Sequence, residues 1–215
     1  LVGSEMCIRD RPNLVMPITR IYMRKMVGHL VLDAESESLN KTLDKAAESG
    51  EQLNLNLLGE AVLGEAEAKS RAERTLKLIQ NPRVTYVSVK ASSMVAQLNQ
   101  WDIDGSVERL KERLRPLYAE AARRNPQVFI NMDMEEYHDL HLTIRLFKEL
   151  MSEPEFKNLE SGIVLQAYLP DTFDALKDIA EFAKQRVAEG GAKVKVRIVK
   201  GANPVSYTHL TLPTI

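Results

Sequence analysis

Five polar side chains follow one another along the chain, and each stands at the end of a short apolar or β-branched run. They are an acid, a base, a second acid, an amide and a guanidinium: Glu60, Lys90, Asp133, Gln166 and Arg197. Consecutive members are 30, 43, 33 and 31 residues apart, close to the roughly 31 residues of one βα unit in a (β/α)8 barrel. Such groups can bind a charged substrate, move a proton or stabilise developing charge. The spacing predicts a polar site at the carboxyl ends of parallel strands.

The elements that must position these residues alternate between strands and helices. The segments between the polar residues carry apolar side chains three or four apart, which is typical of amphipathic helices. Ser106 is expected to cap the helix after the second strand, and Gly190 and Gly191 to end the helix before the last strand. A further helix is predicted over 38–50. The predicted strands are 53–58, 84–90, 128–133, 162–168 and 194–199.

This alternation predicts an α/β fold with a parallel sheet. A doubly wound sheet would show the same alternation, but it usually carries a Gly-rich phosphate loop after its first strand. The segment LNLLGEAVLG contains no GxGxxG motif. The sequence therefore favours a partial (β/α)8 TIM-like barrel of about five of the eight βα units, preceded by a helical N-terminal segment.

Both ends of the sequence differ from the repeating part. Residues 1–10 show no periodic pattern, and residues 204–215 interrupt the βα pattern with uncharged, β-prone residues. We interpret both ends as non-native additions, so that Cys7 and His209 carry no functional information. The predicted organisation is a non-native end at 1–10, a helical N-terminal segment at 11–50, a partial barrel at 51–203 and a non-native tail at 204–215.

The composition argues against several function classes. Lys and Arg number 29 and Asp and Glu 30, so charge gives no reason to expect nucleic acid or an anionic membrane as a partner. A single cysteine excludes a disulfide framework and a Cys-based metal site. His138 and His141 have a spacing that can bind a metal, but we interpret them as part of a solvated first helical turn and predict no metal site. Trp101, in a polar loop, is expected to be a packing residue rather than a lid anchor. These features fit a cytoplasmic protein.

Five segments carry a family resemblance. In chain order they are LNLNLLGEAVLGEAEA, YVSVKASSM, FINMDMEEYHDLHLTIRLF, GIVLQAYLPDTF and VKVRIVKGAN. Together, from about Met26 to Asn203, they resemble the proline dehydrogenase family, and most of all the proline dehydrogenase domain of bacterial bifunctional proline utilization proteins. The resemblance implies a distorted (β/α)8 barrel that holds FAD noncovalently and oxidises L-proline to Δ1-pyrroline-5-carboxylate, the first step of proline catabolism to glutamate. It also implies a membrane quinone as electron acceptor, with the protein at the periphery of the inner membrane during turnover, and it allows a homo-oligomer.

The resemblance also implies roles for individual residues. Lys90 matches the lysine that helps to hold the substrate carboxylate, Asp133 matches the acid beside flavin and substrate, and Glu60 matches an active-site acid. Positive charge at Lys90 and Arg197 would favour the deprotonated amine, the form that can lose a hydride, and Arg197 would stabilise the reduced flavin. The residues that match flavin contacts are Gln166, Arg197, Val199, Lys200, Gly201 and Ala202.

The sequence departs from the family in extent. Five of eight strands are recognisable, and in the family the last barrel helix brings two arginines and a tyrosine that bind proline, for which this chain has no counterpart. We therefore expect that this polypeptide alone is inactive and that the longer protein it derives from, with or without an NAD-dependent aldehyde dehydrogenase domain, oxidises proline. Two alternatives remain open at this stage: a barrel aldolase that uses Lys90 or Lys200 as a Schiff base, and a non-catalytic α/β fragment.

Overall fold

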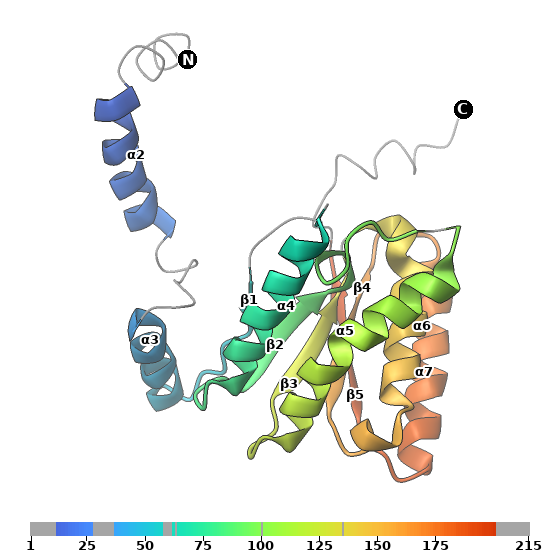
Figure 1. Cartoon of the computed structure of the whole chain (residues 1–215). Coiled ribbons are helices and arrows are strands. Elements are labelled where there is room, and N and C mark those ends of the chain that lie inside the picture. Colours follow the sequence, from blue (N-terminus) through green and yellow to red (C-terminus); the bar gives the residue numbers. More distant parts are fainter. Residues whose placement is uncertain are drawn as a thin grey trace. The chain divides into compact units, whose positions relative to one another are not determined.

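A computed structural model describes residues 12–27, 37–57, 62, 64–99, 101–134 and 136–200 (Figure 1). The chain divides into two compact units, Leu1–Lys45 and Ala46–Ile215. All the strands found among the described residues lie in the second unit. Glu60, Gly201 and Ala202 lie outside the described residues, as do both of the predicted non-native ends.

Strands and helices alternate through the second unit. The strands are β1 (Leu55–Asn56), β2 (Tyr86–Lys90), β3 (Phe129–Asp133), β4 (Ser161–Gln166) and β5 (Val194–Val199). The long helices that follow them are α4 (Glu65–Gln80), α5 (Ile103–Arg123), α6 (Leu140–Met151) and α7 (Thr172–Ala188). Three short 3₁₀ helices are η1 (Ala91–Ser93), η2 (Tyr137–Asp139) and η3 (Pro154–Phe156). Two helices come before the first strand, α2 (Pro12–Val27) and α3 (Glu37–Glu48).

The sheet has the order β1-β2-β3-β4-β5, and every neighbouring pair is parallel. This arrangement confirms the α/β class and the five predicted strands. β1 is shorter than the sequence predicts, because only Leu55 and Asn56 pair with β2. The predicted helix over 38–50 is also confirmed, as α3.

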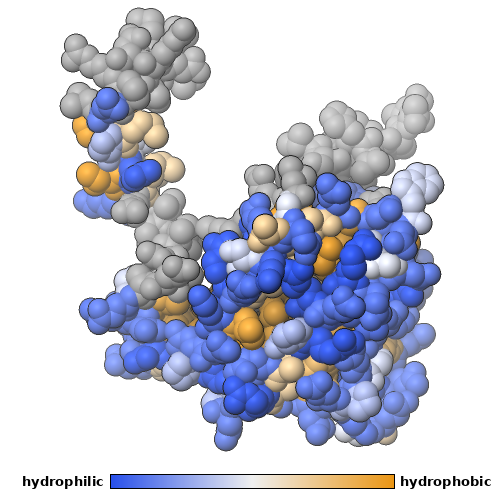
Figure 2. All heavy atoms as spheres, viewed as in Figure 1, coloured by the Kyte–Doolittle hydropathy of each residue, from blue (hydrophilic) through white to orange (hydrophobic). Residues whose placement is uncertain are grey.

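The core lies between the sheet and helices α4 to α7, which lie on one side of it (Figure 1). β4 is buried at all six positions. The helices contribute large side chains that are fully buried, such as Leu114, Phe147 and Ile179. Burying each such side chain contributes about 1.5–3 kcal/mol. The outer surface of this helix layer is mostly hydrophilic, with hydrophobic residues visible mainly between the helices (Figure 2).

The start of α5 differs from the sequence prediction. Asp102, not Ser106, is the N-cap, and its Oδ1 accepts a hydrogen bond from the Gly105 amide at 2.9 Å. Aspartate is as good an N-cap as serine, and it comes earlier in the chain, so the helix begins there. Ser106 is instead buried within the helix, where its Oγ donates to the Asn99 carbonyl at 3.0 Å.

The prediction that Trp101 packs against the protein is wrong, because this residue is 99% exposed. Its backbone is held without help from the indole ring, since the Asn99 side chain accepts from the Trp101 amide at 2.9 Å. The predicted end of α7 is confirmed: the helix stops at Ala188, and Gly190 follows with a φ of 78°. Glycine is favoured at that position because it adopts positive φ without steric cost.

No group of three or more His, Cys, Asp or Glu side chains in the described part of the chain is arranged to hold a metal ion. His138 lies in η2, with its Nε2 3.7 Å from Asp139 Oδ1, and His141 lies in α6. None of the helices in this part is both long and apolar enough to span a membrane.

Candidate functional site

The strand register brings polar residues from neighbouring strands side by side. Side chains at every second position of a strand point to the same face. Lys90 pairs with Asp133, Ser88 pairs with Asn131, and Asn56 pairs with Ser88. These residues come from β1, β2 and β3, and they form a polar row toward the carboxyl ends of the strands.

Asp133 is the centre of this arrangement, and its side chain is 12% exposed. Its Oδ1 accepts hydrogen bonds from Arg197 Nη2 at 2.6 Å, from Asn131 Nδ2 at 2.6 Å and from Ser88 Oγ at 3.3 Å. Its Oδ2 accepts from Asn56 Nδ2 at 3.3 Å. We call this set the Asp133 cluster: Asn56, Ser88, Asn131, Asp133 and Arg197.

Burial dominates the acidity of Asp133. It raises the pKa of this carboxyl above its ordinary value, although Arg197, the two hydrogen bonds from Asn131 and Ser88, and the charge of Lys90 all act to lower the pKa. A charged group costs free energy when it leaves water, and the donors only partly offset that cost. A perturbed carboxyl held by specific partners is a common property of functional sites.

The other predicted site residues lie at the ends of neighbouring strands. Lys90 ends β2 and is partly exposed. Gln166 ends β4, is 1% exposed, and donates through Nε2 to the Met134 carbonyl at 3.4 Å. Val199 ends β5 opposite Gln166, and Lys200 follows it in an exposed position. The structure therefore brings Lys90, Asp133 and Arg197 together and places Gln166 beside Val199.

Four residues near Asp133 were missed by the sequence interpretation. Asn56, Ser88 and Asn131 bind Asp133 directly, and Asn54 donates to Ser88 Oγ at 2.9 Å. A signal for them exists in the sequence. Ser88 and Asn131 each precede a predicted site residue by two positions, so strand alternation places them on the same face as that residue.

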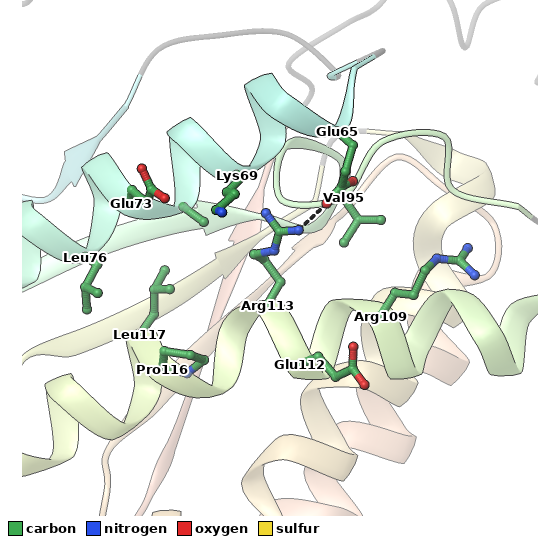
Figure 3. A pocket seen from close by; sticks show the side chains of 11 residues that line it. Glu65, Lys69, Glu73, Leu76, Val95, Arg109, Glu112, Arg113, Pro116 and Leu117 are labelled. Carbon is green, nitrogen blue, oxygen red and sulfur yellow. Dashed lines mark hydrogen bonds and ion pairs between the residues drawn. The ribbon is translucent and has the colours of Figure 1, made fainter.

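A separate hollow lies in the helix layer. It has a volume of about 580 Å³ and lies between α4 and α5 (Figure 3). Polar residues such as Lys69 and Arg109 line it, and Glu65 forms an ion pair with Arg113 across it. No member of the Asp133 cluster lines this hollow. The candidate site is therefore defined by converging polar groups at the strand ends and not by this cavity.

The sequence model of the family described as "Proline dehydrogenase" matches residues 39–208 of the chain. The chain belongs to the proline dehydrogenase family. The match extends past residue 203, so the predicted boundary of the barrel segment remains a prediction.

Solved structures similar to the chain include proline utilization proteins. The structure of proline utilization A (PutA) from Corynebacterium freiburgense is 60% identical, with a TM-score of 0.82, and the alignment covers 93% of this chain and 22% of that one. PutA from Bdellovibrio bacteriovorus, inactivated by N-propargylglycine, is 35% identical with a TM-score of 0.68 and covers 79% of this chain and 19% of that one. The PutA proline dehydrogenase domain has a TIM-barrel-like fold, which supports the predicted barrel class.

Curated relatives are longer than the matched segment. Bifunctional protein PutA of Escherichia coli is 30% identical over 172 residues, which is 74% of this chain and 12% of the relative. Proline dehydrogenase 1 of Bacillus subtilis is 30% identical over 184 residues, which is 86% of this chain and 53% of the relative. The chain thus spans about half of the shorter relative and a small part of the longer one.

Membership of the family implies a flavin cofactor in general, and one feature of the Asp133 cluster suits such a group. Arg197 Nη2 is held by Asp133, whereas Arg197 Nε is buried and has no hydrogen-bond partner among the described residues. A guanidinium offers five donors in a fixed fork. Arg197 therefore keeps a donor for an acceptor atom of a bound ligand while its other side is fixed by the carboxylate.

Proposed function

We propose that this chain forms part of an FAD-dependent proline dehydrogenase barrel, which oxidises L-proline to Δ1-pyrroline-5-carboxylate in proline catabolism. The observation that carries the proposal is the Asp133–Arg197 ion pair, with Lys90 opposite Asp133 in the strand register, at strand ends of a chain of this family. TIM-like barrels carry their active sites at this end of the strands. The family match does not favour the Schiff-base aldolase.

The charges of the site suit an amino acid that must react as a free amine. Lys90, which ends β2 and is partly exposed, would attract the proline carboxylate. Cations near the amine lower the ammonium pKa and favour the neutral form. The lone pair of that amine forms a C=N bond as a hydride leaves the adjacent carbon, and the nitrogen then loses its proton. A bound flavin would supply the acceptor of the hydride.

The cofactor contacts are proposed for the ends of β4 and β5. Arg197, with its remaining donor, would bind an acceptor atom of the isoalloxazine ring and stabilise the negative charge of the reduced ring. Gln166, Val199 and Lys200 lie on the same two strand ends and would complete the contacts. Gly201 and Ala202 keep their proposed role as further contacts. The cofactor is identified as FAD if denaturation of the loaded protein releases FAD and no FMN on chromatography.

The remaining parts of the proposal concern the whole protein. Eight strands close a TIM-like barrel, whereas the sheet of the described residues has five. We propose that turnover requires further strands, as the greater length of the relatives suggests. A membrane quinone is the proposed electron acceptor, with transient binding to the membrane and assembly into a homo-oligomer. Quinone-dependent turnover in the presence of vesicles would test the acceptor.

A chimeric enzyme tests the proposed function. Residues 39–200 of this chain replace the matching segment of Corynebacterium freiburgense PutA, to which the chain is 60% identical. The purified chimera is mixed with L-proline without oxygen, and the flavin absorbance is followed. We expect a yellow protein whose flavin is bleached by L-proline and not by glycine. A chimera whose flavin is bleached by dithionite but unchanged by L-proline would contradict the proposal.

A further inference from the structure

Hydrogen-bond donors surround the Asp133 carboxylate on both oxygens. Among the donors, Asn131 is the most deeply buried, at 0% exposure. Its 2.6 Å contact with Asp133 Oδ1 is as short as that of Arg197, although the asparagine carries no charge. Hydrogen bonds to a charged acceptor are shorter and stronger than neutral ones, so this contact is a substantial part of what holds the carboxylate.

The orientation of the Asn131 amide is fixed by its surroundings. Its Oδ1 lies against Gly162, where an added Cβ would come within 2.8 Å of that oxygen. Among the described residues this Oδ1 has no hydrogen-bond donor. Turning the amide by half a rotation would place the same oxygen against the Asp133 carboxylate, which can only accept when ionised. Asn131 is therefore held as a donor to Asp133, and Gly162 leaves the space for it.

Ser88 is directed toward the same oxygen by a residue behind it. Asn54 Nδ2 donates to Ser88 Oγ at 2.9 Å, and Ser88 Oγ lies 3.3 Å from Asp133 Oδ1. A hydroxyl has one proton to donate. Because Asn54 occupies an acceptor site of the hydroxyl, the Ser88 proton is free to point at Asp133. Both neutral neighbours on β2 and β3 therefore donate to Asp133.

We propose that Asn131 is a positioning residue, assisted by Ser88: its buried amide keeps Asp133 as a carboxylate that faces Arg197, and so fixes the guanidinium at the strand ends. The part played by Arg197 in oxidation rests on the proposed function. The effect of Asn131 on the state of Asp133 does not, and it is measurable in the chain by itself.

The charges around Asp133 explain why neutral donors matter. Arg197 of β5 and Lys90 of β2 are charged groups that act on this carboxyl and lower its pKa. Their attraction does not outweigh burial, and the pKa of Asp133 stays above its ordinary value. Removing Asn131 would favour the neutral carboxyl further. A neutral Asp133 would attract Arg197 less, and the guanidinium would lose its main anchor.

The direct test is the titration of Asp133 in the 215-residue chain. The aspartate carboxyl carbons are labelled with ¹³C, Asp133 is assigned through Asp133→Asn, and its pKa is measured by NMR. We expect the near-isosteric Asn131→Leu to raise the pKa of Asp133 by about 1 to 2 units, the size of one lost hydrogen bond to a charged acceptor. Ser88→Ala should raise the pKa by a smaller amount, because its bond is longer.

A matched control separates positioning from a general effect on packing. Ser161→Ala also removes a buried hydroxyl, one that donates to the Ile130 carbonyl at 2.6 Å on the neighbouring β3. It should leave the titration of Asp133 unchanged. A folded Asn131→Leu chain with the wild-type pKa at Asp133 would overturn the proposal. If Asn131→Leu does not fold, an unchanged pKa in Ser88→Ala would overturn it instead.

The chimera gives a second readout. The rate of flavin reduction by L-proline should fall at acidic pH as Asp133 is protonated, and Asn131→Leu should move this acidic limb upward by the shift seen in the NMR titration. A merely structural role would lower the rate at every pH without moving the limb, and this result would also overturn the proposal. A wild-type chimera that L-proline does not reduce would contradict the proposed function alone, since the NMR titration stands apart from it.

Discussion

At the scale of the residue, Asp133 is stabilised and destabilised at once. Four donors hold it in one orientation, yet burial makes its charge unfavourable. Such a residue serves a site at the expense of the fold, a common compromise at functional positions. The pH dependence of the free energy of unfolding shows whether the charge of Asp133 stabilises or destabilises the fold, because protonation is coupled to folding.

Asp133→Asn should stabilise the chain at neutral pH. Burial raises the pKa of Asp133 above about 3.8, so the folded chain binds this proton more tightly than the unfolded chain does. The resulting stabilisation is complete below about pH 3.8 and is lost as the pH rises through the raised pKa. The gain in the free energy of unfolding of the variant over wild type should therefore grow above pH 4, to on the order of 1 kcal/mol at pH 7.

Urea unfolding at several pH values measures this difference. Asp174→Asn, which removes an exposed carboxylate paired with Lys177, is the matched control for loss of one negative charge. A variant at Asp133 that is less stable than wild type at pH 7, or whose advantage shrinks as the pH rises, would show that the donors outweigh burial.

The sequence predicted only part of the site, for a physical reason. Lys90, Asp133 and Arg197 are charged groups at the ends of apolar runs, and such groups stand out because they are seldom buried without a partner. Ser88 and Asn131 are small neutral residues inside the strands, where the same types also occur as ordinary strand residues. The strand register pairs Ser88 with Asn131, and only there does it become visible that both donate to Asp133.

At the scale of the element, Arg186 of α7 joins the segments that precede β4 and β5. The side chain of Arg186 is mostly buried, and burial lowers the pKa of its guanidinium. Its guanidinium donates to five backbone carbonyls at the end of α6, in and after η3, and in the turn before β5: Met151, Phe156, Lys157, Leu159 and Ala192. Two of these carbonyls, those of Phe156 and Lys157, also accept the backbone amides of Leu159 and Ala192, and Arg186 gives each a further donor in a region where buried polar groups need partners.

Arg186→Met should destabilise the chain by about 3 kcal/mol, because it keeps the apolar stem but removes the guanidinium that donates to these buried carbonyls. Arg123→Met is the control, since Arg123 is 73% exposed and forms a surface ion pair with Glu120, which should be worth under about 1 kcal/mol. Chemical unfolding of both variants measures the difference. Equal stability of the two variants would mean that water satisfies these carbonyls.

The elements themselves were largely predictable. β-branched runs and helical spacing located all five strands, and the glycine pair located the end of α7. Two local features were not predictable from these patterns. Asp102 competed successfully with Ser106 for the cap of α5, and Trp101 remained exposed because hydrogen bonds hold its loop. Both depend on which of several nearby polar side chains reaches a given amide.

At the scale of the whole molecule, β4 inside the sheet and β5 at the end of the described strand order differ in burial. β4 pairs with strands on both sides and is buried throughout. β5 pairs only with β4 in the described part of the chain, none of its residues is buried, and Ile198 is 53% exposed. β4 carries no charged residue, whereas β5 carries Lys195 and Arg197, so the difference follows from both the sequences and the places of the strands in the sheet.

Hydrogen exchange should therefore be slower in β4 than in β5 for this chain. Protection follows burial and paired neighbours, and segments with few buried contacts open at low free energy. Exchange measured by mass spectrometry on peptides covering each strand tests this. In the chimera with Corynebacterium freiburgense PutA, β5 should become as protected as β4. Equal protection of the two strands in the 215-residue chain would contradict this view of β5.

Lys90→Ala in the flavin-loaded chimera tests whether the strand ends carry a proline site. Lys195→Ala is the control, since Lys195 Nζ instead lies 5.0 Å from the Tyr86 ring centre. Steady-state kinetics and flavin content are measured together. We expect Lys90→Ala to raise KM for L-proline at least about 10-fold and to leave the flavin content unchanged. This increase corresponds to a loss of about 1.4 kcal/mol of binding free energy. Loss of flavin with an unchanged KM in the remaining holoenzyme would contradict this expectation.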